Sequence, residues 1–206
     1  MTVMGKYYKE FVTFPDVFVM LVLFVPFMIY TVLHMLQFNT WIALVIGMET
    51  YATSEYIVHR FLFHMKTPKN AFLLKTIKRL HFDHHVDPKD LNLLFLPLWF
   101  SLPNFFIGAA VFYLITGNLQ LTIAFLAGLI AYFLYYEWKH YIAHKPIQPR
   151  TKLGRNTKRA HLWHHFKNEN YWFGVTHTSV DKTFGTYRDQ KQVNKSETAR
   201  NLEKRA

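Results

Sequence analysis

The sequence of 206 residues contains no cysteine. It therefore cannot form disulfides, ligate zinc or an iron–sulfur cluster through thiolates, or use a thiolate nucleophile. Acidic residues are also few, with 13 Asp and Glu against 24 Lys and Arg, which gives a formal net charge of +11. Any metal or acid–base chemistry must come from the twelve histidines and these few carboxylates.

Charged residues are absent from two long stretches, 17–48 and 91–136. Soluble domains rarely contain such stretches, and a helix that crosses a bilayer needs about 20 apolar residues. Short uncharged polar turns divide each stretch, at 37–40 and at 116–120. The pattern predicts an all-α integral membrane protein with four transmembrane helices in two hairpins, near 14–36, 41–63, 92–115 and 120–143.

Positive charge is concentrated at one end of each predicted hairpin. Lys6 and Lys9 precede the first helix, six Lys and Arg lie in the 64–91 connection, and the sequence after Lys145 is basic. Because such residues are retained on the cytoplasmic side, both termini and this connection are predicted to be cytoplasmic. The same rule explains the basic composition, so we expect a lipid bilayer and no nucleic acid as the partner. A single catalytic domain is expected over 1–190, followed by a basic polar tail over 191–206 that is disordered or loosely helical.

Ten of the twelve histidines form two pairs and two triplets. All ten lie at or just after the predicted cytoplasmic ends of the second and fourth helices, so they should converge on one membrane face. Burying them without partners would cost roughly 1–3 kcal/mol each, which argues against a chance assembly. They are His59, His64, His81, His84, His85, His140, His144, His161, His164 and His165.

The spacing within the clusters predicts how these side chains are shared. On a helix, the first His of each H-x-x-H-H triplet shares a face with both later ones, and His140 shares a face with His144. Adjacent histidines such as His84 and His85 diverge by about 100°, so they are more easily divided between two metals. His59 and His64 are five apart, which requires the helix end to bend or unwind. The sequence therefore predicts a site for two metal ions.

Four further residues are candidates for hydrogen bonds to these ligands: Glu55, Asp83, Glu137 and His177. Glu55 lies one turn before His59, where it is expected to accept the second ring N–H and fix the tautomer. A carboxylate in a membrane helix is costly, which makes it a candidate functional residue. His177 is a candidate extra ligand or proton donor.

These motifs make the sequence recognisable. The run from Glu55 to His64, His81-Phe-Asp-His-His85, His140-Tyr-Ile-Ala-His144 and His161-Leu-Trp-His-His165 resemble those of the fatty acid hydroxylase superfamily, which includes sterol desaturases. The first run looks especially like the fatty acid 2-hydroxylases. The resemblance extends over about 55–186 and implies that the ten histidines hold two irons in a cytosolic cap above a transmembrane helical base.

The resemblance also implies O2 as co-substrate and an external electron donor. No cytochrome b5-like domain is fused to the chain, so electrons would come from a separate cytochrome b5-like or ferredoxin-like protein. The short chain looks more like a bacterial member, which favours a bacterial cell membrane. Imidazole suits zinc as well as iron, so the isolated protein could contain zinc.

The resulting hypothesis is a membrane-bound, O2-dependent lipid hydroxylase that acts near the carboxyl end of an acyl chain, such as position 2, with no catalytic residue beyond the metal centre. Lys139, Lys145, Lys158 and Arg159 are candidates for holding an anionic group of the substrate. Sterol or carotenoid hydroxylation or desaturation is the alternative within the superfamily. A His-rich metal transporter is a remote alternative, because it would need ligands along a transmembrane path.

Overall fold

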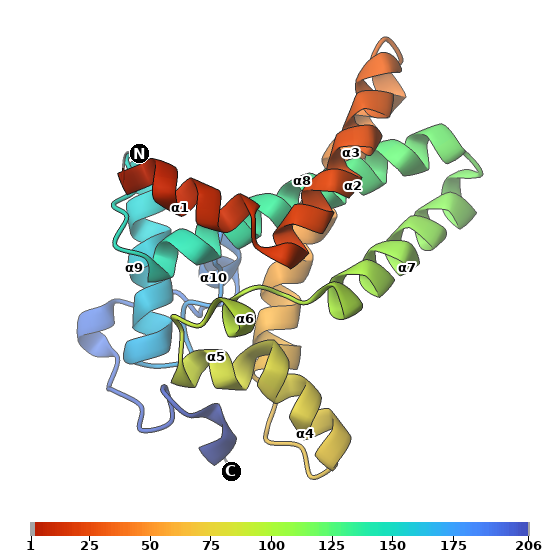
Figure 1. Cartoon of the computed structure of the whole chain (residues 1–206). Coiled ribbons are helices and arrows are strands. Elements are labelled where there is room, and N and C mark those ends of the chain that lie inside the picture. Colours follow the sequence, from red (N-terminus) through yellow and green to blue (C-terminus); the bar gives the residue numbers. More distant parts are fainter. Residues whose placement is uncertain (1–2, 206) are drawn as a thin grey trace. The chain divides into compact units, whose positions relative to one another are not determined.

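The computed structural model describes residues 3–205, and over these residues the chain forms helices and loops with no strand (Figure 1). The predicted all-α class is confirmed. The α-helices are α1 (Val3–Val12), α2 (Pro15–Leu33), α3 (Phe38–Ile57), α4 (Ala71–Ile77), α5 (Asp83–Val86), α6 (Leu91–Leu94), α7 (Leu98–Thr116), α8 (Leu119–His144), α9 (Lys152–Phe166) and α10 (Ser179–Thr183). Two π-helices, η1 (Val58–Phe63) and η2 (Lys78–Phe82), and two 3-10 helices, η3 (Gln190–Gln192) and η4 (Leu202–Lys204), complete the chain.

The described chain divides into two compact units, each built from two separate stretches of sequence. The first comprises residues up to 52 and 96–137, and the second comprises 53–95 and the residues from 138 onward. Helices α3 and α8 each begin in the first unit and end in the second. All ten clustered histidines belong to the second unit.

Within the first unit, two glycines allow the backbones of α3 and α8 to approach closely. A Cβ atom on Gly47 would lie 2.0 Å from the carbonyl oxygen of Phe125, and one on Gly128 would lie 2.1 Å from that of Leu44. Small residues at such crossings are typical of helices that pack in a membrane, where close van der Waals contact drives association. This crossing holds α3 and α8 together within the first unit.

Three helical stretches are long and apolar enough to cross a membrane: Pro15–Leu33, Leu91–Thr116 and Leu119–His144. They match the first, third and fourth predicted transmembrane helices. Leu91–Thr116 is interrupted between α6 and α7.

The second predicted span, 41–63, falls on α3 and η1 and is not among these three stretches. Glu49, Glu55 and several neutral polar residues make α3 less apolar than the other three. The fourth transmembrane helix therefore stays a prediction.

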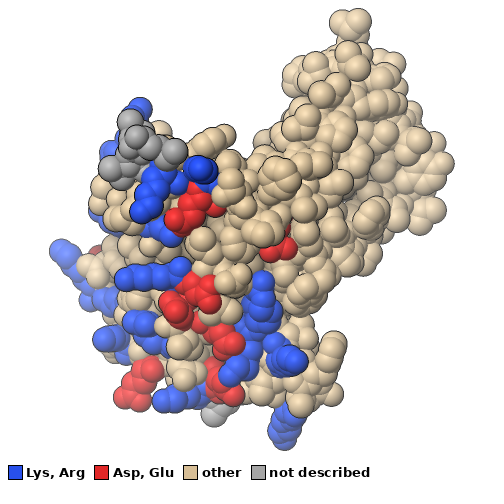
Figure 2. Space-filling model, in the orientation of Figure 1, with Lys and Arg blue, Asp and Glu red and all other residues tan. Residues whose placement is uncertain are grey.

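Charged side chains are unevenly distributed on the face drawn in Figure 2. Lys and Arg gather with acidic residues over the region of α1, α5 and α9, whereas the region of α7 and the outer part of α2 shows none. Helices α2 and α7 carry largely exposed apolar residues such as Leu33, Phe106 and Leu114. Surfaces of this kind are expected to face lipid.

The segment expected to be disordered or loosely helical instead packs into the second unit. Val193, Ala199 and Leu202 are buried, and the backbone N–H of Ser196 donates to the carbonyl of Lys167 at 2.7 Å. The segment's low average hydrophobicity suggested disorder, but Val193, Ala199 and Leu202 occupy buried positions.

Candidate metal centre

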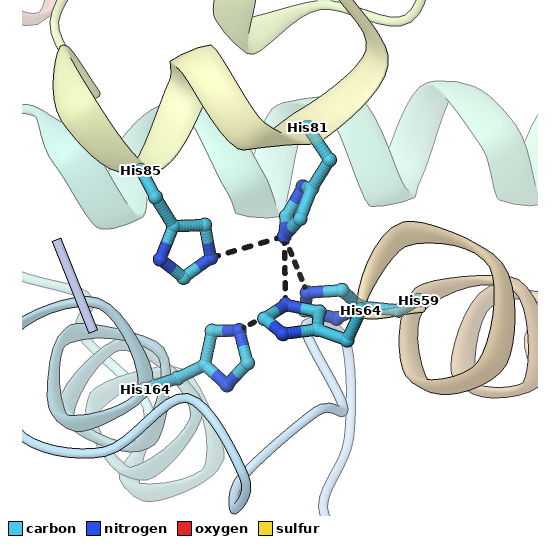
Figure 3. Close-up of side chains that lie close together, drawn as sticks. All are labelled: His59, His64, His81, His85 and His164. Carbon is cyan, nitrogen blue, oxygen red and sulfur yellow. Dashed lines mark hydrogen bonds between the residues drawn. The ribbon is translucent and has the colours of Figure 1, made fainter. Parts of the chain in front are cut away.

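The ten clustered histidines meet in the second unit as two groups of five. In each group, one ring nitrogen from every residue lies within 4.8 Å of the others. The first group, drawn in Figure 3, comprises His59, His64, His81, His85 and His164. The second group comprises His84, His140, His144, His161 and His165. Nine of the ten side chains are buried, and His144 is half-buried.

Local helix geometry accounts for this division. The π-helix η1 ends with the N–H of His64 donating to the carbonyl of His59 at 3.1 Å, an i to i+5 bond that brings both side chains into the first group. The prediction that the helix end bends or unwinds is therefore confirmed, because the π-helix is wound less tightly than an α-helix. His84 and His85 fall in different groups, as the divergence of adjacent helical residues predicts.

The distances around His81 fit a bound metal better than hydrogen bonding. Its Nε2 lies 3.1 Å from that of His59, 2.9 Å from that of His64 and 3.0 Å from that of His85. A neutral imidazole nitrogen carries one hydrogen or one lone pair, so it can satisfy only one of these three contacts as a hydrogen bond. Metal–nitrogen bonds of about 2.1 Å at right angles place neighbouring ligand nitrogens about 3.0 Å apart. The first group therefore has the spacing of nitrogens around one ion.

The second group shows the same close approach. The Nε2 atoms of His84 and His140 are 2.9 Å apart, and those of His144 and His161 are 2.8 Å apart. His165 is fully buried, and neither of its ring nitrogens has a hydrogen-bond partner among the described residues. An unsatisfied buried nitrogen is costly, and a metal ion would provide the missing partner.

Burial also favours the protonation state that binds metal. It lowers the pKa of His85 to about 3, and burial together with neighbouring imidazoles lowers the pKa of His81 and His164 well below the ordinary value. These residues are therefore neutral at pH 7. Neutral imidazole is the form that ligates a metal, so no proton has to be displaced.

A loop after α9 orients two histidines of the first group. The Nδ1–H of His59 donates to the carbonyl of Phe173 at 2.5 Å, and that of His164 donates to the carbonyl of Tyr171 at 2.7 Å. Each bond fixes the proton on Nδ1 and leaves Nε2 free to ligate. The backbone of residues 171–173 therefore supplies hydrogen bonds that orient two of the metal ligands.

The prediction that Glu55 accepts a hydrogen bond from His59 is wrong. The buried carboxylate accepts the N–H groups of Val175 at 3.0 Å and Thr176 at 2.9 Å, and the Thr176 hydroxyl at 2.8 Å. The ring N–H of His59 has already been taken by the Phe173 carbonyl. Glu55 therefore acts on His59 indirectly, by fixing the loop that carries this carbonyl.

Asp181 in α10 is a second buried carboxylate that accepts hydrogen bonds from the same loop, and the sequence interpretation did not include it as a site residue. It accepts the N–H groups of Phe173 and Gly174, each at 2.8 Å, and the Thr186 hydroxyl at 2.7 Å. A Cβ atom on Gly174 would lie 2.1 Å from the carbonyl oxygen of His177 and 2.7 Å from Asp181 Oδ2, so only glycine fits. The residues that make these contacts lie in two short runs of the sequence, Phe173-Gly-Val-Thr176 and Asp181-Lys-Thr-Phe-Gly-Thr186.

The other three candidates for outer hydrogen bonds make the following contacts. Asp83 pairs with Lys78 at 3.7 Å near the surface, where its side chain is 39% exposed. Glu137 is buried in the first unit and accepts the N–H of Leu96 at 3.0 Å. His177 belongs to neither group, and its Nδ1 lies 2.7 Å from the hydroxyl of a neighbouring serine. These contacts do not test the expected role, which stays a prediction for all three residues.

Two of the four cations considered for substrate binding donate to buried or half-buried groups of the second unit. The ammonium of Lys158 donates to the carbonyls of Ile142, Lys145 and Ile147 at 2.6 to 2.9 Å, where it caps the end of α8 just after His144. That of Lys139 donates to a threonine hydroxyl at 2.6 Å. Both side chains therefore stabilise the second unit.

The chain belongs to the fatty acid hydroxylase family, because the model of that family matches residues 41–186. It is 34% identical over 147 residues to the fatty acid 2-hydroxylase of Rattus norvegicus, covering 69% of this chain and 38% of the relative. It is 36% identical over 149 residues to the ceramide very long chain fatty acid hydroxylase SCS7 of Saccharomyces cerevisiae, covering 69% and 37%. The chain thus spans less than two-fifths of the length of these relatives.

A solved structure also resembles this fold. The structure described as full-length scs7p, with only the hydroxylase domain visible, aligns with a TM-score of 0.75 at 26% identity. The alignment covers 86% of this chain and 69% of that one. The likeness extends the family assignment to the fold.

Proposed function

We propose that the protein is a membrane-bound, O2-dependent lipid hydroxylase whose ten clustered histidines hold two iron ions, five to each ion. The observation that carries this proposal is the packing of ten imidazoles, nine of them buried, into two groups with Nε2 atoms about 3 Å apart. The family assignment supports the reaction class.

Two bound irons would supply the oxidation of an unactivated C–H bond with O2, which acid–base side chains cannot perform. The chain holds the ligand nitrogens in place, with the Phe173 and Tyr171 carbonyls fixing two ring orientations. No other catalytic residue is proposed. Electrons come from a separate cytochrome b5-like or ferredoxin-like protein, and zinc can replace iron in the isolated protein without oxidising activity.

The substrate we propose is a fatty acid or acyl lipid, hydroxylated near its carboxyl end, at position 2. His140 and His144 end the apolar helix α8, and His59 follows α3 directly. A lipid can therefore keep its tail among apolar helices while its functional end reaches the metals. The names of the relatives, fatty acid 2-hydroxylase and ceramide hydroxylase, agree with this position of attack.

We infer a topology of four transmembrane helices. Three are the apolar stretches described above, and α3 is the fourth. The basic flanks of the hairpins favour cytoplasmic termini and a cytoplasmic metal centre. Residues 1–190 form one catalytic domain in this proposal, because each compact unit is discontinuous in sequence. The bacterial cell membrane remains a prediction.

Lipid analysis of a host that expresses the protein tests the reaction. Hydroxylated acyl chains should accumulate with the unaltered chain and disappear with His144→Ala. Unsaturated products, or oxidised sterols or carotenoids, would instead support the alternative within the superfamily. No lipid change together with altered metal uptake would favour a transporter.

Metal analysis tests the centre independently. Protein from iron-replete cells should contain two metal ions per chain, and His84→Ala and His164→Ala should each remove one, because the two residues belong to different groups. Fewer than about one metal per chain would refute the two-metal centre.

A further inference from the structure

Residues 193–205, which we call the strap, contact the first histidine group directly. The carbonyl of Ala199 accepts the Nδ1–H of His85 at 2.7 Å. The guanidinium of Arg200 donates to the backbone carbonyls of His85 and Val86 at 3.3 and 3.1 Å. The strap therefore orients the His85 ring and holds the helix turn that carries it.

A second ligand of the first group is held by Arg205. Its Nη1 donates to the carbonyl of His64 at 3.0 Å and lies 3.3 Å from the Nδ1 of the same residue. Its other groups reach Asn170 at 2.9 Å and the buried carboxylate of Glu169 at 3.8 Å. His64 and His85 both belong to the first group.

The strap is anchored by burial as well as by hydrogen bonds. Leu202 is completely buried and Ala199 is 1% exposed. The hydroxyl of Thr198 donates to Glu169 at 2.5 Å, and Lys78 pairs with Glu203 at 2.6 Å. The strap lies outside residues 41–186 that match the family model, so the family motifs do not describe it.

The outer hydrogen bonds differ between the two groups. In the first group, the Nδ1 atoms of His59, His85 and His164 each meet a backbone carbonyl. In the second group, the Nδ1 atoms of three members lack a hydrogen-bond partner among the described residues: His84, His161 and His165. The strap supplies one of these three carbonyls, that of Ala199.

We propose that the strap is a functional part of the metal centre and serves the first group selectively. The Ala199 carbonyl fixes the tautomer and orientation of His85, and Arg205 fixes the backbone of His64. Loosening the strap releases the metal of the first group while the second group keeps its own. This inference rests on the two-metal centre of the proposed function.

The test is metal analysis of the full chain, purified in detergent and loaded with Zn2+ as the probe. Leu202→Asp places a charge in the anchoring position and should lower the metal content from two ions per chain to one. Arg205→Gln, which removes no buried apolar side chain, should weaken binding in the first group by about 10- to 100-fold. Lys204→Gln changes an exposed neighbouring cation and should leave both sites intact.

Combining variants identifies which metal is lost. In the Leu202→Asp background, His84→Ala should remove the remaining ion, whereas His85→Ala should change nothing further. Retention of two ions by Leu202→Asp together with an unchanged Zn2+ affinity of Arg205→Gln would overturn the inference, as would loss of the second-group ion. If Leu202→Asp fails to fold, as judged by helical circular dichroism, Arg205→Gln alone decides. An unaltered chain that binds no pair of metals would refute the proposed function instead.

Discussion

The role of Glu55 gives the sharpest test of how the metal centre is held in place. Replacing it by alanine leaves the N–H groups of Val175 and Thr176 without their acceptor in a buried region. Each such donor costs about 1–3 kcal/mol, so Glu55→Ala should lower the free energy of unfolding by about 2–6 kcal/mol. The loop carrying the Phe173 carbonyl should also loosen, which weakens metal binding through His59 by about 10- to 100-fold.

The assay pairs the free energy of unfolding, from titration with a denaturing detergent, with Zn2+ affinity from chelator competition. Glu55→Gln is the matched control, because its amide oxygen can still accept both backbone N–H groups and its NH2 can donate to the Thr176 hydroxyl. This variant should retain most of the stability and most of the affinity. An alanine variant within about 0.5 kcal/mol of the unaltered protein, with unchanged Zn2+ affinity, would refute the reasoning.

Three further substitutions probe other parts of the structure. Lys158→Met removes the ammonium that caps α8 just after His144, a ligand of the second group, so this variant should bind one metal ion instead of two. The control Arg159→Met changes an exposed neighbouring cation and should still bind two. Gly47→Ala inserts a methyl 2.0 Å from a backbone oxygen and should lower thermal stability in detergent, whereas Gly108→Ala, with a nearest contact of 3.4 Å, should not. Gly174→Ala meets a carbonyl at 2.1 Å, so Zn2+ affinity should fall; an unchanged affinity would show that this loop does not hold the ligands.

Residue spacing was sufficient to predict how the histidine ligands are grouped. The five-residue interval from His59 to His64 required the helix end to bend or unwind, and the π-helix η1 unwinds it. The adjacency of His84 and His85 favoured a division between two metals, and the structure places them in different groups. Both deductions follow from helix geometry, which depends on sequence interval alone.

Predictions about hydrogen-bond partners were less successful. Glu55 was assigned to His59 because one helical turn separates them, but the tertiary fold brings the residue 173 carbonyl to that ring and turns Glu55 towards Val175 and Thr176. Composition likewise suggested a disordered segment after residue 190, although Leu202 is fully buried. The hydrogen bonds of His59 and Glu55 join residues more than 100 positions apart, and no local pattern encodes them.

The ligands of the centre and the groups that hydrogen-bond to them therefore differ in how easily the sequence predicts them. The ligand nitrogens belong to side chains of one residue type, so their pattern can be recognised directly. Their outer partners are main-chain carbonyls of Tyr171, Phe173 and Ala199, and any amino acid supplies a carbonyl. The sequence can therefore specify these carbonyls only through residues that hold the backbone in position, such as Glu55 and Asp181, which accept its N–H groups. An unexplained buried carboxylate beside a histidine cluster is thus better searched for backbone N–H partners than for a bond to the nearest imidazole.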